Sequence, residues 1–308
     1  MNIIYHSDTY LLEPCVVTVG FFDGVHAGHR YLIDELKTIA KENNLNSVVV
    51  TFFVHPRKVL NVEFKPDLLT NLNEKLIQLA STGIDACVVL NFDSEIAKLS
   101  AYDFLKKILF DKINAKALLV GHDHRFGHNR SDGFPEYKMY GEEIGIQVFQ
   151  AHRYKTNEDR YISSSEVRVA LEYGNIEQAN RLLSYPYSIQ GKVITGFKIG
   201  RKIGFPTANI EIEDTDKLIP GTGVYAVIVK WNGQQYIGML NVGNRPTLNN
   251  GNNITIEVHI INFESDIYNE TIKIDFIKKI RDEQKFNSLE ELVEQLKIDR
   301  ENVLNINL

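Results

Sequence analysis

The sequence predicts two domains, an α/β domain built on a parallel sheet and an all-β domain that closes into a small barrel. First, its 308 residues are more than one ordinary domain holds and are comfortable for two. Second, the first half alternates short, wholly apolar runs with helical patterns, as strands covered on both faces do. Third, from about residue 185, short β-rich segments follow one another between glycine, asparagine and proline turns. We therefore expect domains over residues 1–184 and 185–308.

Five apolar runs are the expected strands of the parallel sheet. They cover residues 16–20, 47–53, 86–92, 117–121 and 146–151. Between the first two, residues 30–44 have apolar side chains at helical spacing, which predicts a helix. Another helix is expected after Ser100, because Ser100 and Asp103 have the spacing of an N-terminal cap. Ligands of such sheets bind beyond the carboxyl ends of the strands, which directs attention to residues 20–29 and 121–127.

Six β-rich segments are the expected strands of the barrel. They cover residues 188–194, 208–212, 223–231, 234–243, 254–263 and 270–280. A final helix is expected over 288–299, where Ser288 and Glu291 have the spacing of a capping box. Its apolar stripe would consist of Leu289, Leu292, Val293 and Leu296.

Composition excludes several classes of protein. A hydrophobic content of 44%, a charged content of 24% and a net charge of −6 describe an ordinary globular chain, not one that coats nucleic acid. Cys15 and Cys87 stand in apolar surroundings without metal-ligand spacing, so we expect buried free thiols in a reducing compartment. The N-terminal residues lack the pattern of a signal peptide, and no apolar run has the length of a membrane span. We expect a cytoplasmic protein without a nucleic-acid, membrane or obligatory protein partner.

The segment GFFDGVHAGHRYLI (20–33) places two histidines where an apolar run becomes a helical pattern. A helix start carries unpaired N–H groups and a partial positive charge, so it is a natural seat for phosphate. Gly28 removes a side chain where phosphate would approach, and His26 and His29 would reach the same phosphoryl group. The alternative is a pair of ordinary surface histidines on a loop whose glycines serve the turns.

A second phosphate-binding pattern is ISSSEVR (162–168). It offers hydroxyls at the start of a helical pattern, with Arg168 one turn further on, a combination that can hold a triphosphate. The alternative is a serine N-cap followed by a solvated arginine.

The stretch GKVITGFKIGRKIGFPTANIEI (191–212) is rich in glycine, which in β structure marks bulges or places where the backbone closes on a ligand. Thr207 and Asn209 are two residues apart, so on a strand they face the same way and offer two hard oxygens for Mg²⁺. Positive charge nearby comes from Lys198, Arg201 and Lys202. The alternative is a barrel corner with a polar surface strand.

Glu257 is a candidate general base. It alternates with Ile256 and Val258 and so faces away from them, where a carboxylate could take a proton from a substrate hydroxyl that attacks a γ-phosphate. A solvated glutamate on a strand has the same spacing.

Together, the H-x-G-H and ISSSEVR segments resemble the signatures of the nucleotidyltransferase superfamily. The longer segments 17–29, 51–56, 121–133 and 161–168 resemble the adenylyltransferase module of prokaryotic FAD synthetases. Segments 191–210, 220–227, 241–247 and 257–286 are similar to the riboflavin kinase family. Their order is that of bifunctional prokaryotic riboflavin kinase/FMN adenylyltransferases. The resemblance implies a Rossmann-like nucleotidyltransferase domain followed by a six-stranded Greek-key barrel with a C-terminal helix.

The resemblance also implies roles for individual residues. The first domain would join FMN and ATP into FAD, and the barrel would phosphorylate riboflavin, with ATP as co-substrate and Mg²⁺ at both steps. Catalytic residues would be His26, His29 and Glu257, and the metal would be held by Thr207 and Asn209. ATP and phosphate would be bound by Gly20, Phe21, Phe22, Asp23, Gly28, Ser163, Ser164, Arg168, Gly196, Lys198, Gly200, Arg201 and Gly204. Flavin would be bound by His55, Pro56, Asp123, Arg125, Phe126, Asn244, Arg245, Arg281 and Phe286.

Three departures from the family pattern stand out: His124 replaces the commoner Phe, Val258 a Thr, and Asn269 a Gly. Three alternatives to the two-step enzyme remain. One module could be degenerate, the chain could be a flavin-binding regulator without turnover, or the first domain could transfer another nucleotide. Both motif sets are intact and Glu257 is retained, which favours the two-step enzyme.

Overall fold

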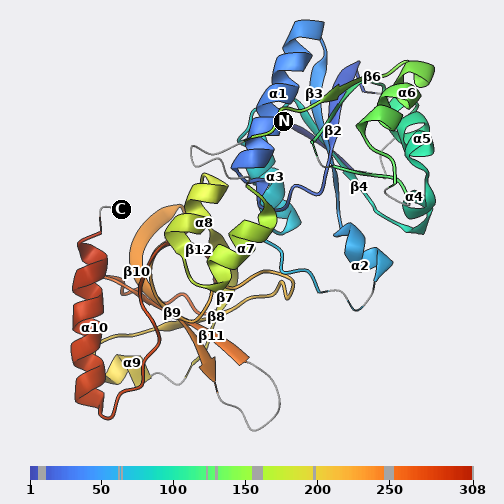
Figure 1. Cartoon of the computed structure of the whole chain (residues 1–308). Helices are drawn as coiled ribbons and strands as arrows, with labels where there is room; N and C mark the ends of the chain where they lie inside the picture. Colours follow the sequence, from blue (N-terminus) through green and yellow to red (C-terminus); the bar gives the residue numbers. More distant parts are fainter. Residues whose placement is uncertain are drawn as a thin grey trace. The chain divides into compact units, whose positions relative to one another are not determined.

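The computed structural model describes residues 1–5, 12–61, 63, 65–122, 124–128, 131–154, 162–196, 199–245 and 253–306, apart from the side chains of residues 199, 245 and 253. The chain divides into two compact units, Met1–Ser164 and Ser165–Leu308 (Figure 1). No helix within these ranges combines the length and the apolar character needed to cross a lipid bilayer.

The first unit contains a parallel sheet, as expected, with six strands where five were predicted. Its strands are β1 (Asn2–Tyr5), β2 (Cys15–Val19), β3 (Asn46–Phe52), β4 (Ala86–Leu90), β5 (Ala115–Val120) and β6 (Gln147–Gln150). Their order is β1-β4-β3-β2-β5-β6, and every neighbouring pair is parallel. The chain leaves β2 toward β3 and later returns to its other side as β5. In such a sheet this is the switch point, beyond which ligands bind.

Helices cover both faces of this sheet. The described helices of this unit are η1 (Asp23–Val25), α1 (Ala27–Asn43), α2 (Pro56–Leu60), α3 (Leu72–Ala80), α4 (Ser94–Lys98), α5 (Ala101–Asp103), the π-helical η2 (Phe104–Phe110) and α6 (Phe134–Ile144), of which α2 buries no residue. Helices α1 and α3 pack on one face, where Leu36 and Leu79 join Val49 in one core cluster. The other face is covered by η2 and α6 (Figure 1).

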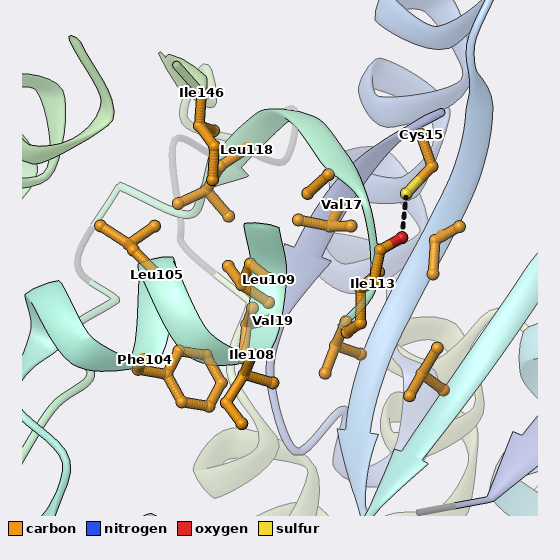
Figure 2. Packing of buried hydrophobic residues seen from close by; sticks show 14 of the residues in the cluster. Cys15, Val17, Val19, Phe104, Leu105, Ile108, Leu109, Ile113, Leu118 and Ile146 are labelled. Atoms are coloured by element: carbon orange, nitrogen blue, oxygen red, sulfur yellow. Dashed lines mark hydrogen bonds between the residues drawn. The ribbon is translucent and has the colours of Figure 1, made fainter. Parts of the chain in front are cut away.

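Figure 2 shows the packing under η2, where Cys15 and Val17 of β2 lie with Leu105 and Leu109 in one apolar cluster. The Cys15 thiol donates to the carbonyl oxygen of Ile113 at 3.6 Å. Cys15 and Cys87 are both free and fully buried, as predicted. Burial raises the pKa of each thiol to about 12, so neither is a reactive thiolate.

The second unit contains a closed antiparallel barrel of six strands. They are β7 (Ser188–Ile194), β8 (Ala208–Glu211), β9 (Gly223–Trp231), β10 (Gln234–Arg245), β11 (Asn253–Ile260) and β12 (Thr271–Arg281). Around the barrel the order is β10-β11-β8-β7-β12-β9. Strands β9, β10 and β11 follow one another, and β12 returns to lie beside β9. This is the Greek-key pattern that was expected.

Four helices accompany the barrel: α7 (Ser164–Glu172), α8 (Ile176–Leu183), α9 (Ile199–Lys202) and α10 (Leu289–Leu304). Helix α8 is tied to the barrel by Asn180, whose amide nitrogen donates to the carbonyl oxygen of Phe276 at 2.9 Å. The same side chain accepts the N–H of Tyr187 at 2.7 Å. These contacts explain why the second compact unit begins at Ser165, before the expected boundary between residues 184 and 185. That the functional domains divide at residues 184 and 185 stays a prediction.

The C-terminal helix begins as expected but differs in detail. The Ser288 hydroxyl accepts the N–H of Glu291 at 3.2 Å, whereas the Glu291 carboxylate accepts the N–H of Asn287 instead of completing a box with Ser288. Val293 and Leu296 pack against a core cluster that includes Met239 of β10. Leu289 was wrongly placed in the buried stripe, since it is 56% exposed at the first turn.

The paired parts of β10 and β11 carry a buried apolar row on one face and the polar residues of the candidate site on the other. On β10 and β11, Leu240 and Val242 pair with Val258 and Ile256, and all four are buried. The opposite face carries Asn241 and Glu257, which also pair directly. This is the face of Met239, which packs under α10. The base candidate therefore faces away from the buried row, as the alternation predicted.

Candidate active sites

The H-x-G-H turn lies at the carboxyl end of β2, where the sheet topology places a ligand site. His26 is the N-cap of α1, and its Nδ1 accepts the N–H of His29 at 3.3 Å. The two rings are stacked, with centroids 3.7 Å apart and an interplanar angle of 17°. The structure thus brings both predicted histidines to one side of a helix start.

His29 stands in electropositive surroundings. Burial lowers the pKa of its imidazole well below 6.5, and the electrostatic influence of His26, His124 and Lys75 lowers it further. Its Nδ1 is buried and has no hydrogen-bond partner within the described part of the chain. A neutral imidazole among groups of positive potential is suited to meet an incoming polyphosphate.

Phe22 and Asp23 shape the turn. Phe22 adopts a left-handed backbone (φ 55°) and buries its ring, and a Cβ added at Gly20 would lie 2.9 Å from that ring. The buried Asp23 carboxylate accepts the N–H groups of Leu69 and Thr70, at 3.0 to 3.1 Å. These contacts hold the loop in place. Direct contact of Phe22 and Asp23 with ATP stays a prediction.

The second phosphate-binding motif reaches the same turn. The Ser164 hydroxyl donates to the carbonyl oxygen of Asp23 at 3.0 Å. A Cβ at Gly28 would lie 3.3 Å from both the His26 ring and the carbonyl oxygen of Ile162, so Gly28 permits this close approach. Ser163 precedes α7, and Arg168 lies within α7 in the second compact unit.

Lys75 is a site residue that sequence reasoning missed. It is 1% exposed, and its ammonium donates to the carbonyl oxygens of Phe21 and Phe52, both at 3.1 Å. The ammonium also lies 3.9 Å from the centroid of the Phe21 ring. Burial lowers the pKa of Lys75 to about 8, and the Asp23 charge opposes that shift. Lys75 thus joins the carboxyl ends of β2 and β3 beneath the H-x-G-H turn.

Of the residues predicted to bind flavin in the first unit, His55 contacts the H-x-G-H turn through Phe21. The His55 ring meets the Phe21 ring edge-on at 4.5 Å, and Pro56 begins α2. Phe126 stacks on Tyr137 at 4.2 Å, and its ring centroid lies 6.1 Å from that of His124. Arg125 and Asp123 were also predicted to bind flavin. Arg125 is exposed and donates to the carbonyl oxygen of Ser131 at 3.3 Å, whereas Asp123 lies outside the described residues.

The second candidate site is a polar row across three neighbouring strands. Glu257 of β11 pairs with Asn209 of β8 on one side and with Asn241 of β10 on the other. The Thr207 hydroxyl donates to Oε2 of Glu257 at 3.3 Å. Hydroxyl, amide and carboxylate oxygens therefore gather where the motif predicted them. Asn241 was missed, because only the register of β10 shows that it lies opposite Glu257.

Glycines make room for this row. A Cβ at Gly196 would lie 2.1 Å from the amide nitrogen of Asn209, and one at Gly200 would lie 2.2 Å from the carbonyl oxygen of Phe205. Gly204 has a φ of +83°, a conformation that favours glycine. Arg201 is exposed on α9, and Lys198 lies outside the described residues.

The end of β12 is joined to α10 by an ion pair. The Arg281 guanidinium donates to both carboxylate oxygens of Asp299 at 2.8 to 3.0 Å, and Asp299 is fully buried on α10. The Phe286 ring centroid lies 5.8 Å from the Arg281 guanidinium carbon. The Nε and Nη2 atoms of Arg281 are therefore already engaged by a carboxylate of the protein. Asn244 is exposed on β10, and the structure does not describe the side chain of its neighbour Arg245.

Over the described ranges, no group of three or more His, Cys, Asp or Glu side chains could hold a metal ion.

Comparison with known proteins matches both parts of the chain. A family model described as FAD synthetase matches residues 9–166, and one described as riboflavin kinase matches residues 183–307. The bifunctional riboflavin kinase/FMN adenylyltransferase of Bacillus subtilis (strain 168) is 38% identical over 293 residues, covering 94% of this chain and 91% of the relative. The protein of the same description from Escherichia coli (strain K12) is 38% identical, covering 93% and 91%.

A solved structure has the same fold in full. A protein from Streptococcus pneumoniae described as a macrolide-efflux protein aligns over 100% of both chains, with a TM-score of 0.91 and 32% identity. The fold, both motif sets and the two family models agree. The chain belongs to the bifunctional riboflavin kinase/FMN adenylyltransferase family.

Proposed function

We propose that the chain makes FAD from riboflavin in two ATP-dependent steps, FMN being formed at the barrel and adenylylated at the parallel sheet. The observation that carries this proposal is the pairing of Glu257 with Asn209, with the Thr207 hydroxyl 3.3 Å from the Glu257 carboxylate. A binding protein without turnover would gain little from a carboxylate held beside a hydroxyl and an amide.

At the barrel, Glu257 acts as general base. Its carboxylate accepts the proton of the terminal ribityl hydroxyl of riboflavin, while that oxygen attacks the γ-phosphorus of ATP. The bond from the γ-phosphorus to the β,γ-bridging oxygen breaks, and ADP leaves. Gly196, Gly200 and Gly204 let the backbone approach the phosphates, and Lys198 and Arg201 supply positive charge. Asn244, Arg245, Arg281 and Phe286 form the flavin side of this site.

At the parallel sheet, a phosphate oxygen of FMN attacks the α-phosphorus of ATP, and pyrophosphate leaves. His26 accepts the His29 N–H at Nδ1, so its neutral ring carries the proton at Nε2 and can donate it to a phosphate oxygen. His29 is the second donor on the same side of the helix start. No covalent enzyme intermediate is needed, because orientation and charge stabilisation lower the barrier.

Substrate phosphates would also contact the turn and the serine motif. The proposed contacts in the first unit are those of Gly20, Phe21, Phe22, Asp23, Gly28, Ser163 and Ser164, joined by Arg168 of α7. Flavin would lie against His55, Pro56, Asp123, Arg125 and Phe126. The free thiols Cys15 and Cys87 support a cytoplasmic location.

Mg²⁺ is the proposed metal. The hydroxyl of Thr207 and the amide oxygen of Asn209 are hard donors, and Gly196 leaves space for the Asn209 side chain where a Cβ would collide with it. The ion, when bound with ATP, would shield phosphate charge. The two side chains would orient it relative to Glu257.

Product analysis tests the function directly. The protein is incubated with riboflavin, ATP and Mg²⁺, and the flavins are separated by chromatography. FAD is expected. FMN alone would show that only the kinase works, and unchanged riboflavin would show a binding protein. A parallel incubation of FMN with ATP or CTP tests which nucleotide the first site transfers.

A further inference from the structure

His259 stands two residues beyond Glu257 on β11, on the same face of the strand. Its Nδ1 lies 2.8 Å from the carbonyl oxygen of Pro206. Its ring meets the Phe205 ring edge-on, with centroids 5.3 Å apart and an interplanar angle of 61°. A single half-buried imidazole thus contacts both residues that precede Thr207.

This contact lies where the strand ladder stops. Between β11 and β8, Glu257 pairs with Asn209 and Val258 pairs with Ala208, and β8 begins at Ala208. One position earlier Thr207 is exposed, and Pro206 has no N–H with which to extend a ladder. The next residue of β11 supplies a side-chain donor to the Pro206 carbonyl in place of a backbone bond.

We propose that His259 is a positioning residue of the kinase site, whose Nδ1–H holds the Pro206 carbonyl and so sets the Thr207 hydroxyl against Glu257. The proposal rests on the proposed kinase function. Because the acceptor is a carbonyl oxygen, the proton of the neutral ring is on Nδ1. Burial lowers the pKa of His259, the hydrogen bond to Pro206 opposes part of that shift, and the charge of Arg300 on α10 lowers the pKa further. The ring therefore stays neutral near pH 7 and keeps this tautomer.

The geometry of the bond gives a matched set of variants. His259→Asn places an amide N–H near the place of the imidazole Nδ1, whereas His259→Gln places its amide near Nε2 and His259→Ala removes the donor. Thr255→Ala is the control. Thr255 lies two residues before Glu257 on the same face, and its hydroxyl also donates to a backbone carbonyl, that of Gly243, at 3.3 Å. Each variant is made in the full chain.

Two measurements are made on each variant. The first is kcat/KM for riboflavin phosphorylation as Mg²⁺ is varied, with conversion of FMN to FAD in the same preparation as a check of folding. The second is hydrogen exchange of the peptide that covers residues 203–211, followed by mass spectrometry without ligands. Removing a partner that orients metal ligands lowers affinity or activity by roughly ten- to a hundredfold.

We expect His259→Ala and His259→Gln to lose roughly that factor in kcat/KM for riboflavin phosphorylation, to need more Mg²⁺, and to exchange faster over residues 203–211. His259→Asn and Thr255→Ala should behave as wild type, and FAD formation from FMN should be unchanged throughout. The proposal fails if His259→Ala keeps wild-type kinetics or exchange, if Asn and Gln act alike, or if Thr255→Ala loses as much. Absence of FMN formation by the wild-type chain would overturn the kinase function itself.

Discussion

The Lys75 ammonium and the Phe21 ring are in contact, with the nitrogen 3.9 Å from the ring centroid, while the same ammonium donates to the Phe21 carbonyl at 3.1 Å. The Phe21 ring also meets the His55 ring, with centroids 4.5 Å apart. A buried cation therefore fixes the residue that connects the phosphate-binding turn to the segment expected to bind flavin. Its charge also reaches His29, whose pKa it lowers.

Replacing Lys75 with Met should raise the pKa of His29. Removing a buried positive neighbour makes protonation of the imidazole less costly, although burial and His26 still oppose it. Histidine resonances followed by NMR across pH give the value directly. Lys37→Met is the matched control, because Lys37 is a half-exposed lysine of the same unit that pairs with Asp34. An unchanged His29 pKa in Lys75→Met would refute the coupling.

Acid should destabilise the first unit through His29. The pKa of His29 in the folded protein lies well below the ordinary 6.5. As pH falls below 6.5, His29 is therefore protonated in the unfolded chain while it stays neutral in the folded chain. The free energy of unfolding then decreases, with a slope of at most about 1.4 kcal/mol per pH unit from this group. Urea denaturation of wild type and His29→Asn between pH 7.5 and 5 measures the difference in slope. Equal slopes would show that His29 titrates normally.

Glu257→Gln should abolish FMN formation and spare the conversion of FMN to FAD. Gln keeps the size of the side chain beside Thr207 but cannot accept the ribityl proton, so we expect a loss of roughly 10² to 10⁴ in kcat for the kinase. Glu211→Gln, at the exposed end of β8, changes the same charge on the neighbouring strand and should have little effect. Equal losses in both reactions would contradict the division of roles between the two units.

His29→Ala should have the opposite outcome. FMN formation continues, while FAD formation from FMN falls, because one of the two donors at the helix start is gone. Both conversions are measured in one assay by chromatography. Persistent FAD synthesis would remove His29 from the catalytic residues.

The buried pair of Arg281 and Asp299 should be necessary for barrel stability. Asp299→Asn leaves the guanidinium without its counter-charge, and breaking a buried ion pair typically costs about 3 kcal/mol or more. Trp231 is the only tryptophan of the chain and lies on β9, so its fluorescence during urea unfolding reports on the barrel. The control is Asp282→Asn, whose exposed carboxylate pairs with Lys279 and should matter little. A double variant, Arg281→Met with Asp299→Leu, should recover most of the loss.

Much of the fold could be predicted from the sequence because its strands are marked in two distinct ways. The parallel strands are continuous apolar runs, and the barrel strands are short segments between turn residues. Strand β1 was missed because it has four residues and pairs only at the edge with β4, where Ile3 is 43% exposed. Asn269, which replaces a common Gly, has a φ of 65°, a conformation that Asn tolerates better than most residues.

The residues around the sites were harder to predict, since their positions depend on register and tertiary packing. A lysine at helical spacing within 72–80 reads as solvent-exposed, yet Lys75 points under the sheet edge where two carbonyls need a donor. Asp299 likewise reads as a surface residue on α10 until Arg281 is placed beside it. His259 alternates along β11 like any strand residue, and only the end of the β8 ladder shows its partner. Motif residues were found because their spacing along the chain is itself the signal.

The parity of the barrel strands has a practical consequence for protein engineering. On β8, β10 and β11, Asn209, Asn241 and Glu257 carry odd numbers, whereas Ile210, Val242 and Val258 carry even numbers and are buried. Met239 of β10 is also odd-numbered but is buried in the core cluster under α10, so it must be left out. Randomising the odd positions of β8 and β11 together with Asn241 of β10 would vary substrate preference and leave the buried even positions untouched. A library built in this way would vary the residues of the site while it keeps the buried residues on which folding depends.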